Sequence, residues 1–116
     1  MNIRDIYLAS WNETDSPSRD ALLSSTWNPT ARYVDPLADV EGVEAISGLI
    51  GAVHSQYPGF VFSPIGDVDS HHGVSRFQWG LAMPGEEPAV VGFDVVTASE
   101  DGRIQAVAGF IDKFPS

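Results

Sequence analysis

The sequence predicts an α+β domain in which helices cover one face of a curved, mainly antiparallel β-sheet. Two observations indicate this class: apolar residues recur at intervals of three and four in the first half, and strand-like segments separated by turns fill the second half. A single core usually occupies about 100–150 residues. The 116 residues are therefore expected to form one domain spanning residues 1–116.

Three helices are expected in the first half of the chain. The first covers residues 3–11, where apolar side chains share one face. The second begins at Ser16-Pro17, where a capping residue precedes a proline at the first helical position, and it ends before Pro29. The third covers residues 43–56 and ends before a Pro-Gly pair.

Five strands are expected, one before the third helix and four after it. Their residues are 30–35, 60–68, 74–83, 89–99 and 103–113. Pairs typical of turns separate the last four: His72-Gly73, Pro84-Gly85 and Asp101-Gly102. Neighbouring strands joined by such short turns should form an antiparallel meander.

Composition argues against several classes of function. Six Lys and Arg stand against 16 Asp and Glu, so the net charge of −10 should repel nucleic acids and anionic membranes. The absence of cysteine excludes disulfides, thiolate catalysis and zinc fingers. No segment has the length of a membrane span and the first residues do not form a signal peptide, so a cytoplasmic location is expected.

Asp94 interrupts a strand that otherwise has the pattern of one buried on both faces. An ionised carboxylate there costs several kcal/mol unless it is paired, and otherwise its pKa rises and it holds a proton. Two interpretations stay open. One is a salt bridge to Arg76 on the neighbouring strand, and the other is a protonated acid that donates a hydrogen bond to an oxyanion in a pocket.

Two further residues are candidates for chemistry. Asp35 ends a strand and precedes a proline, which favours a turn-initiating aspartate and leaves a catalytic carboxylate open. His54 lies on the edge of the apolar stripe of the third helix. A hydrogen-bonded core histidine is favoured there over a catalytic one.

Several segments together resemble the nuclear transport factor 2-like superfamily, in particular its SnoaL-like and ketosteroid-isomerase-like members. The segments are ARYVDP, GVEAISGLI and GFDVVTASEDGRIQAVAGF, and the resemblance covers nearly the whole chain. It implies a cone-shaped domain with three N-terminal helices packed into a strongly curved sheet. It leaves the reaction open, because the superfamily contains cyclases, dehydratases, epoxide hydrolases and binding modules.

The resemblance also implies roles for single residues. Asp35, with the proline after it, is similar to the general base of the isomerases, and Asp94, eight residues before a Gly-Arg-Ile turn, is similar to their protonated oxyanion donor. Trp27 and Tyr7 correspond to two pocket tyrosines. Ile50 is a departure, because the isomerases have a tyrosine there that supports the oxyanion network.

We therefore expect an apolar pocket for a hydrophobic small molecule that bears a carbonyl, with Asp35 as base and Asp94 as oxyanion donor. This proton transfer needs no metal and no organic cofactor. The expected ligand-binding residues are Tyr7, Trp11, Trp27, Ile50, His54, Phe77, Trp79 and Leu81. The alternative is a non-catalytic binding or interaction module that uses the same cavity.

The two faces of the sheet should have different roles. The strand around Trp79 alternates apolar residues with polar or small ones, so it has one apolar face for the helices to cover. The resemblance puts Asp94 on that same face. The opposite face carries Phe93, Val95 and Phe110, which is too much apolar surface to leave in water and predicts a homodimer through the sheet.

Overall fold

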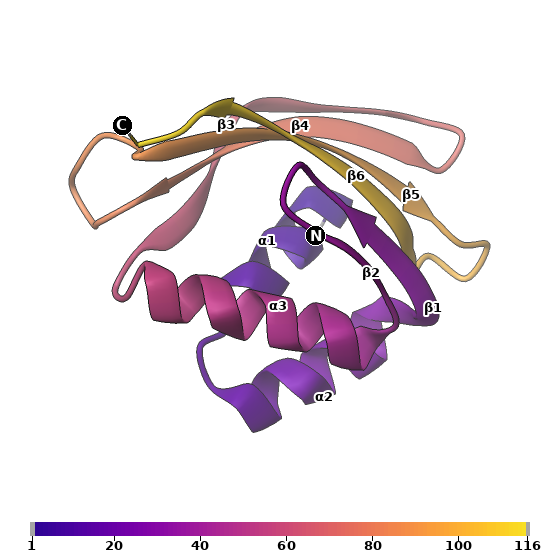
Figure 1. Cartoon of the computed structure of the whole chain (residues 1–116). Helices are drawn as coiled ribbons and strands as arrows, with labels where there is room; N and C mark the ends of the chain where they lie inside the picture. The colour runs from indigo at the N-terminus through magenta and orange to yellow at the C-terminus, as the bar shows by residue number, and fades with distance from the viewer. Residues whose placement is uncertain (1, 116) are drawn as a thin grey trace.

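All three expected helices form in a computed structural model, which describes residues 2–115 (Figure 1). They are α1 (Ile3–Asn12), α2 (Ser16–Thr26) and α3 (Val43–Gln56). The side chains of Asn2 and Asp15 cap the first two helices by accepting hydrogen bonds from backbone N–H groups of the first turn. No helix within residues 2–115 is long and apolar enough to cross a membrane.

Six strands form one open, mixed sheet. They are β1 (Trp27–Val34), β2 (Asp39–Glu41), β3 (Val61–His71), β4 (Val74–Ala82), β5 (Val90–Ala98) and β6 (Ile104–Lys113). Their order is β2-β1-β6-β5-β4-β3, and every neighbouring pair is antiparallel except β1 and β6, which run parallel. The predicted α+β class with a mainly antiparallel sheet is confirmed.

The first two strands differ from the expectation. β1 starts at Trp27 rather than at residue 30, so Trp27 belongs to the sheet and not to a helical segment. Pro29 is tolerated inside this strand because the register against β6 is irregular between Trp27 and Arg32, where no regular ladder needs its N–H. The sequence does not predict β2, because its three residues are too few to show an alternating pattern.

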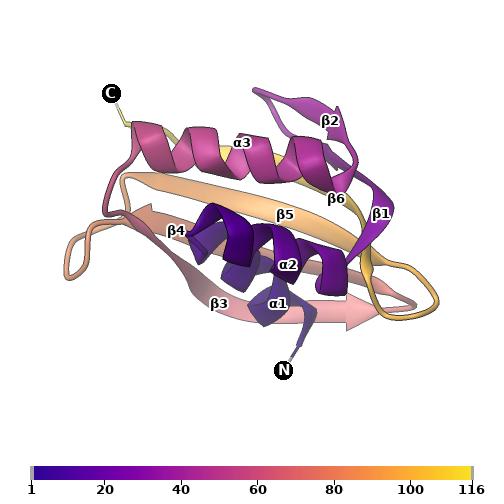
Figure 2. The ribbon, with the colours of Figure 1, turned by 90° about the horizontal axis from the view of Figure 1, so that it is seen from below.

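The helices cover the concave face of the sheet, and the core lies between these two layers (Figures 1 and 2). The expected apolar face of β4 is the covered one, since Phe77, Trp79 and Leu81 are all buried. Phe93 and Phe110 stand opposite each other in the register of β5 and β6, on the uncovered face. Phe110 is 57% exposed there.

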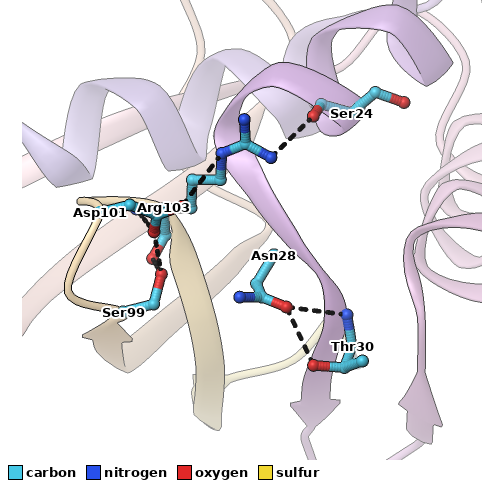
Figure 3. A network of polar contacts seen from close by, with 6 residues as sticks. All are labelled: Ser24, Asn28, Thr30, Ser99, Asp101 and Arg103. Atoms are coloured by element: carbon cyan, nitrogen blue, oxygen red, sulfur yellow. Dashed lines mark hydrogen bonds and ion pairs between the residues drawn. The ribbon is translucent and has the colours of Figure 1, made fainter.

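Polar contacts tie the turn between β5 and β6 to the end of α2 (Figure 3). The guanidinium of Arg103 donates a hydrogen bond of 3.5 Å to the carbonyl of Ser24 near the C-terminal end of α2, where the helix dipole favours a cation. Asp101 accepts hydrogen bonds from the hydroxyl of Ser99 and the backbone N–H of Arg103. These contacts hold the start of β6, at the opposite end of that strand from Lys113.

Gly92 of β5 makes room for the ring of Trp79, which a Cβ at this position would overlap. We expect Gly92→Ala to lower the free energy of unfolding by about 1–3 kcal/mol, because the ring would have to leave its packed position. Gly48→Ala is the control: nothing lies within 4 Å of its added methyl, and it should raise stability by about 0.5–1 kcal/mol in this exposed turn of α3. Urea denaturation measures both, and a Gly92→Ala protein as stable as wild type would contradict the packing of Trp79 over Gly92.

Candidate functional site

An aromatic pocket of about 100 Å³ lies between the helices and the concave face of the sheet. Its aromatic wall consists of Tyr7, Trp11, Tyr33, Tyr57, Phe62 and Trp79. Leu37 and Phe114 also line it and are exposed, so the pocket opens to solvent beside them. The cavity is small beside the ~300–1,000 Å³ of pockets that bury drug-sized ligands, and closer to the ~150 Å³ apolar cavity that accepts benzene.

The structure divides the predicted site residues into two groups. Those that line the pocket are Tyr7, Trp11, Asp35, Trp79 and Leu81. Those that lie outside its lining are Trp27, Ile50, His54, Phe77 and Asp94.

Three of the second group are core residues rather than pocket residues: Trp27, Ile50 and Phe77 are each at most 1% exposed. The rings of Trp27 and Phe77 pack against Tyr7 with centroid distances of 5.9 and 5.5 Å. His54 is held by a hydrogen bond of 2.6 Å between its Nε2 and a backbone carbonyl of α1. Apolar periodicity identifies the buried face of an element, but it does not tell which part of that face borders a cavity.

Asp94 of β5 points toward the helices and is 1% exposed. The indole N–H of Trp79 donates a hydrogen bond of 3.0 Å to its Oδ2. Desolvation by burial raises the pKa of Asp94 to about 6. Hydrogen bonding from Tyr7 and Trp79 works against this rise in pKa, whereas the charge of Asp35 adds to it.

The salt bridge between Asp94 and Arg76 that the sequence left open does not form. The Arg76 guanidinium instead lies 3.2 Å from the carboxylate of Asp69, and both side chains are exposed. Successive residues of a strand point to opposite faces, and Asp94 stands opposite Phe77 in the register, so Arg76 faces away from it. With a pKa of about 6, roughly one Asp94 in ten is protonated at pH 7.

Asp35 directly follows β1 at the edge of the pocket, and both of its carboxyl oxygens accept hydrogen bonds. Oδ1 accepts from the backbone N–H groups of Leu37 and Ala38, each at 2.8 Å. Oδ2 accepts from the hydroxyl of Tyr33 at 2.6 Å. Asp35 therefore holds the turn after β1, and the same side chain also lines the pocket.

The side chains of Asp35 and Asp94 both pack beside Gly109 of β6. Gly109 stands opposite Asp94 in the antiparallel register, and the parallel pairing of β6 with β1 brings Asp35 close to the same point. A Cβ on Gly109 would lie 2.8 Å from Oδ1 of Asp94 and 3.3 Å from the Cβ of Asp35. Because Gly109 has no side chain, both aspartates have room to pack at this position.

Tyr33 belongs to this site, although the sequence does not single it out. It lies on β1 two residues before Asp35, which directly follows the strand, so the two side chains share a face. That spacing is the signal that could have found Tyr33. Burial and the nearby charge of Asp94 raise the pKa of Tyr33 and that of Tyr7. Both hydroxyls therefore keep their protons and can act as hydrogen-bond donors.

Three helices packed into a curved, mixed sheet form the fold that this chain shares with solved nuclear transport factor 2-like structures, among them one from Exiguobacterium sp. 255-15 that is 20% identical, with a TM-score of 0.73 over 94% of this chain and 97% of that one. Comparison with a more similar solved structure identifies the family within this fold. The chain is 40% identical to a candidate isomerase of the SnoaL-like family from Agrobacterium tumefaciens str. C58, with a TM-score of 0.90 over 95% of this chain and 94% of that one. The chain belongs to the SnoaL-like family.

More distant solved structures share the fold. A candidate polyketide cyclase from Sinorhizobium meliloti is 22% identical, with a TM-score of 0.69 over 92% of both chains. A SnoaL-like protein of unknown function from Burkholderia thailandensis is 14% identical, with a TM-score of 0.72 over 93% of this chain and 90% of that one. No protein-family model and no curated protein matches the chain.

Asp94 should make the stability of the protein depend on pH. Folding raises its pKa from 3.8 to about 6, so the stability linked to its proton is complete below about pH 4 and is lost as the pH rises through 6. We expect this loss to reach about 3 kcal/mol above pH 7, because one pKa unit corresponds to about 1.4 kcal/mol.

Urea unfolding of wild type and Asp94→Asn between pH 4 and 8 measures this contribution. The amide has nearly the shape of the protonated acid and does not titrate, so the difference in unfolding free energy between the two proteins should change by that amount. Asp69→Asn, at an exposed carboxyl, is the control and should follow wild type closely. Parallel curves for wild type and Asp94→Asn would contradict the raised pKa.

Proposed function

We propose that the protein binds a small apolar molecule bearing a carbonyl group and catalyses a proton transfer on it, in the manner of an isomerase or cyclase. One observation carries this proposal: two aspartates in different environments pack beside Gly109, one at the pocket edge and one buried with a raised pKa. Carboxyl groups in such different environments can divide the roles of base and acid between them.

Asp35 is the proposed base. Its carboxyl lines the pocket, and the hydrogen bond from Tyr33 orients Oδ2. Oδ2 has a second lone pair, which can accept a proton from a carbon next to the ligand carbonyl. A positioned general base typically contributes about 10²–10⁴-fold to the rate.

Asp94 is the proposed acid that stabilises the resulting enolate oxygen. Its protonated form predominates below pH 6. Because Asp94 lies outside the pocket lining, its effect on a ligand passes through the hydroxyl of Tyr7, which lines the pocket and lies near Asp94. Loss of one such oxyanion-stabilising donor typically costs about 10²–10³ in rate.

A non-catalytic binding module is the second candidate. Asp35 accepts three hydrogen bonds, two from its own turn and one from Tyr33. These bonds favour a non-catalytic protein, since a purely structural aspartate would make the same ones. Both candidates bind a ligand in the pocket. Only exchange of ligand protons separates them.

Cyclopentanone is a suitable probe, because its six heavy atoms match the size of a ligand that enters an apolar cavity of about 150 Å³. We expect wild type to accelerate the exchange of its α-protons for deuterium in D₂O, followed by NMR. Asp35→Asn should lose this acceleration by about 10²–10⁴-fold. The wild-type exchange should slow as the pH rises above about 6, because Asp94 then loses its proton.

Asp69→Asn is the matched control, since Asp69 is an exposed carboxylate paired with Arg76, and it should exchange at the wild-type rate. Binding of cyclopentanone without any exchange would leave the binding module as the function. Exchange by Asp35→Asn at the wild-type rate would remove Asp35 from the role of base.

We also propose that two copies of the chain pair through the uncovered face of the sheet. Phe93 stands opposite Phe110 on this face, and Val95 stands opposite Ala108 beside them. An apolar patch of this kind on so acidic a chain favours coverage by a partner, and a two-fold axis lets one patch meet its own copy.

Phe110→Asp should convert the dimer into a monomer, because it buries a charge at the centre of the proposed contact. Sedimentation velocity at micromolar concentration measures the state. Leu37→Asp is the control, since Leu37 is 76% exposed and lies at the pocket, and this variant should stay dimeric. A monomeric wild type at that concentration would contradict the proposal.

A further inference from the structure

The indole N–H of Trp11 is an unused hydrogen-bond donor in the wall of the pocket. The side chain is 5% exposed and its ring lines the cavity, yet Nε1 has no hydrogen-bond partner within residues 2–115. A buried donor without a partner destabilises a protein, and an acceptor on a ligand would recover that free energy.

The other two tryptophans have their donors occupied. The indole N–H of Trp79 bonds to Oδ2 of Asp94, and that of Trp27 bonds to the hydroxyl of Ser10, each at 3.0 Å. Among the residues that the structure describes, Trp11 is therefore the tryptophan whose N–H is free to serve a ligand.

The Trp11 ring is held in place without a ligand. It packs against Tyr33 and Phe62 with centroid distances of 5.5 and 5.3 Å. The backbone carbonyl of Trp11 is bonded to His54, and the next residue, Asn12, exchanges two hydrogen bonds of 2.8 Å with the backbone of Phe62. A donor that is already ordered loses little entropy when it binds.

The charges around the pocket disfavour an anionic acceptor. The described lining residues include no lysine, arginine or histidine, whereas Asp35 lines the pocket and Asp94 bonds to its wall. A carboxylate or phosphate would meet these aspartates without a compensating cation. An uncharged oxygen is the acceptor that fits.

We propose that the indole N–H of Trp11 binds the carbonyl oxygen of the ligand and thereby selects a ketone or aldehyde over a hydrocarbon of the same shape. This inference rests on the proposed function and names the residue that touches the ligand oxygen. The hydroxyl of Tyr7 lies near both Asp94 and the Trp11 indole, without completing a hydrogen bond to the latter. An oxygen bound to Trp11 is therefore close to the proposed acid.

The indole signals in a ¹H–¹⁵N NMR spectrum test this role directly. The three tryptophans should give three signals, assigned with Trp11→Phe, Trp27→Phe and Trp79→Phe. Titration of wild type with cyclopentanone should move the Trp11 proton downfield, as a new hydrogen bond does. Methylenecyclopentane has the same shape without an acceptor and should cause no downfield shift.

Relative affinity is the second readout. The ratio of the Kd for cyclopentanone to that for methylenecyclopentane should rise about tenfold in Trp11→Phe, as loss of one hydrogen bond does. Trp27→Phe is the matched control, because it removes an indole whose N–H is bonded to Ser10 in the core, and its ratio should equal that of wild type. The wild-type titration decides the matter even if Trp11→Phe does not fold.

Each outcome has a distinct meaning. Ketone binding with an unmoved Trp11 signal, or with an unchanged Kd ratio in Trp11→Phe, overturns the role of Trp11. The pocket would then remain the proposed binding site. Ketone binding that moves the signal without proton exchange keeps the role of Trp11 and removes only the catalysis. A wild type that binds no ketone overturns this inference together with the proposed function.

Discussion

The buried carboxyl of Asp94 is the constraint on which the concave face of this sheet depends. A carboxyl group beneath packed helices is costly, and the groups beside this one among residues 2–115 are the indole of Trp79 and the phenol of Tyr7 rather than a cation. The Trp79 ring bonds to Asp94 only because Gly92 leaves room for it. Gly109 leaves the corresponding space beside the other oxygen. The burial of this one carboxyl thus explains why a tryptophan and two glycines occupy their positions on three adjacent strands.

The parallel pairing of β1 with β6 brings a second carboxyl to the same place. Because of this pairing, the C-terminal end of β1 lies beside Gly109 of β6. The turn that Asp35 holds therefore lies at the edge of the pocket. The structural role of Asp35 and its proposed role as base meet in this one side chain, since the oxygen that accepts the turn's N–H groups belongs to the carboxyl that lines the cavity. Tyr33 supports both roles through its bond to Oδ2.

We expect the wall of the pocket to select a ligand by size and by polarity. Its aromatic rings leave about 100 Å³, which suits a compact ligand, and the cavity opens to solvent beside Leu37 and Phe114. The residues that line the cavity include tyrosines and tryptophans, and among the described ones there is no lysine, arginine or histidine to attract an anion. This combination supports the proposed uncharged carbonyl ligand over a carboxylate or a phosphate.

The sequence by itself determined the helices, five of the six strands to within three residues, and the α+β class. Periodicity, capping residues and turn pairs depend only on residues that are close in the sequence, so they predict these elements without a structure. The sequence also singled out both aspartates, one inside an apolar strand and one before a proline. Their meeting was decided only by the tertiary structure, because it depends on a parallel pairing between strands at the two ends of the chain. The same holds for the lining of the pocket: Trp27 and Phe77 are as aromatic as Trp11 and Tyr33, and only the packing of the layers separates core from cavity. A cavity is the space that packed layers leave unfilled, and no local pattern of residues encodes it.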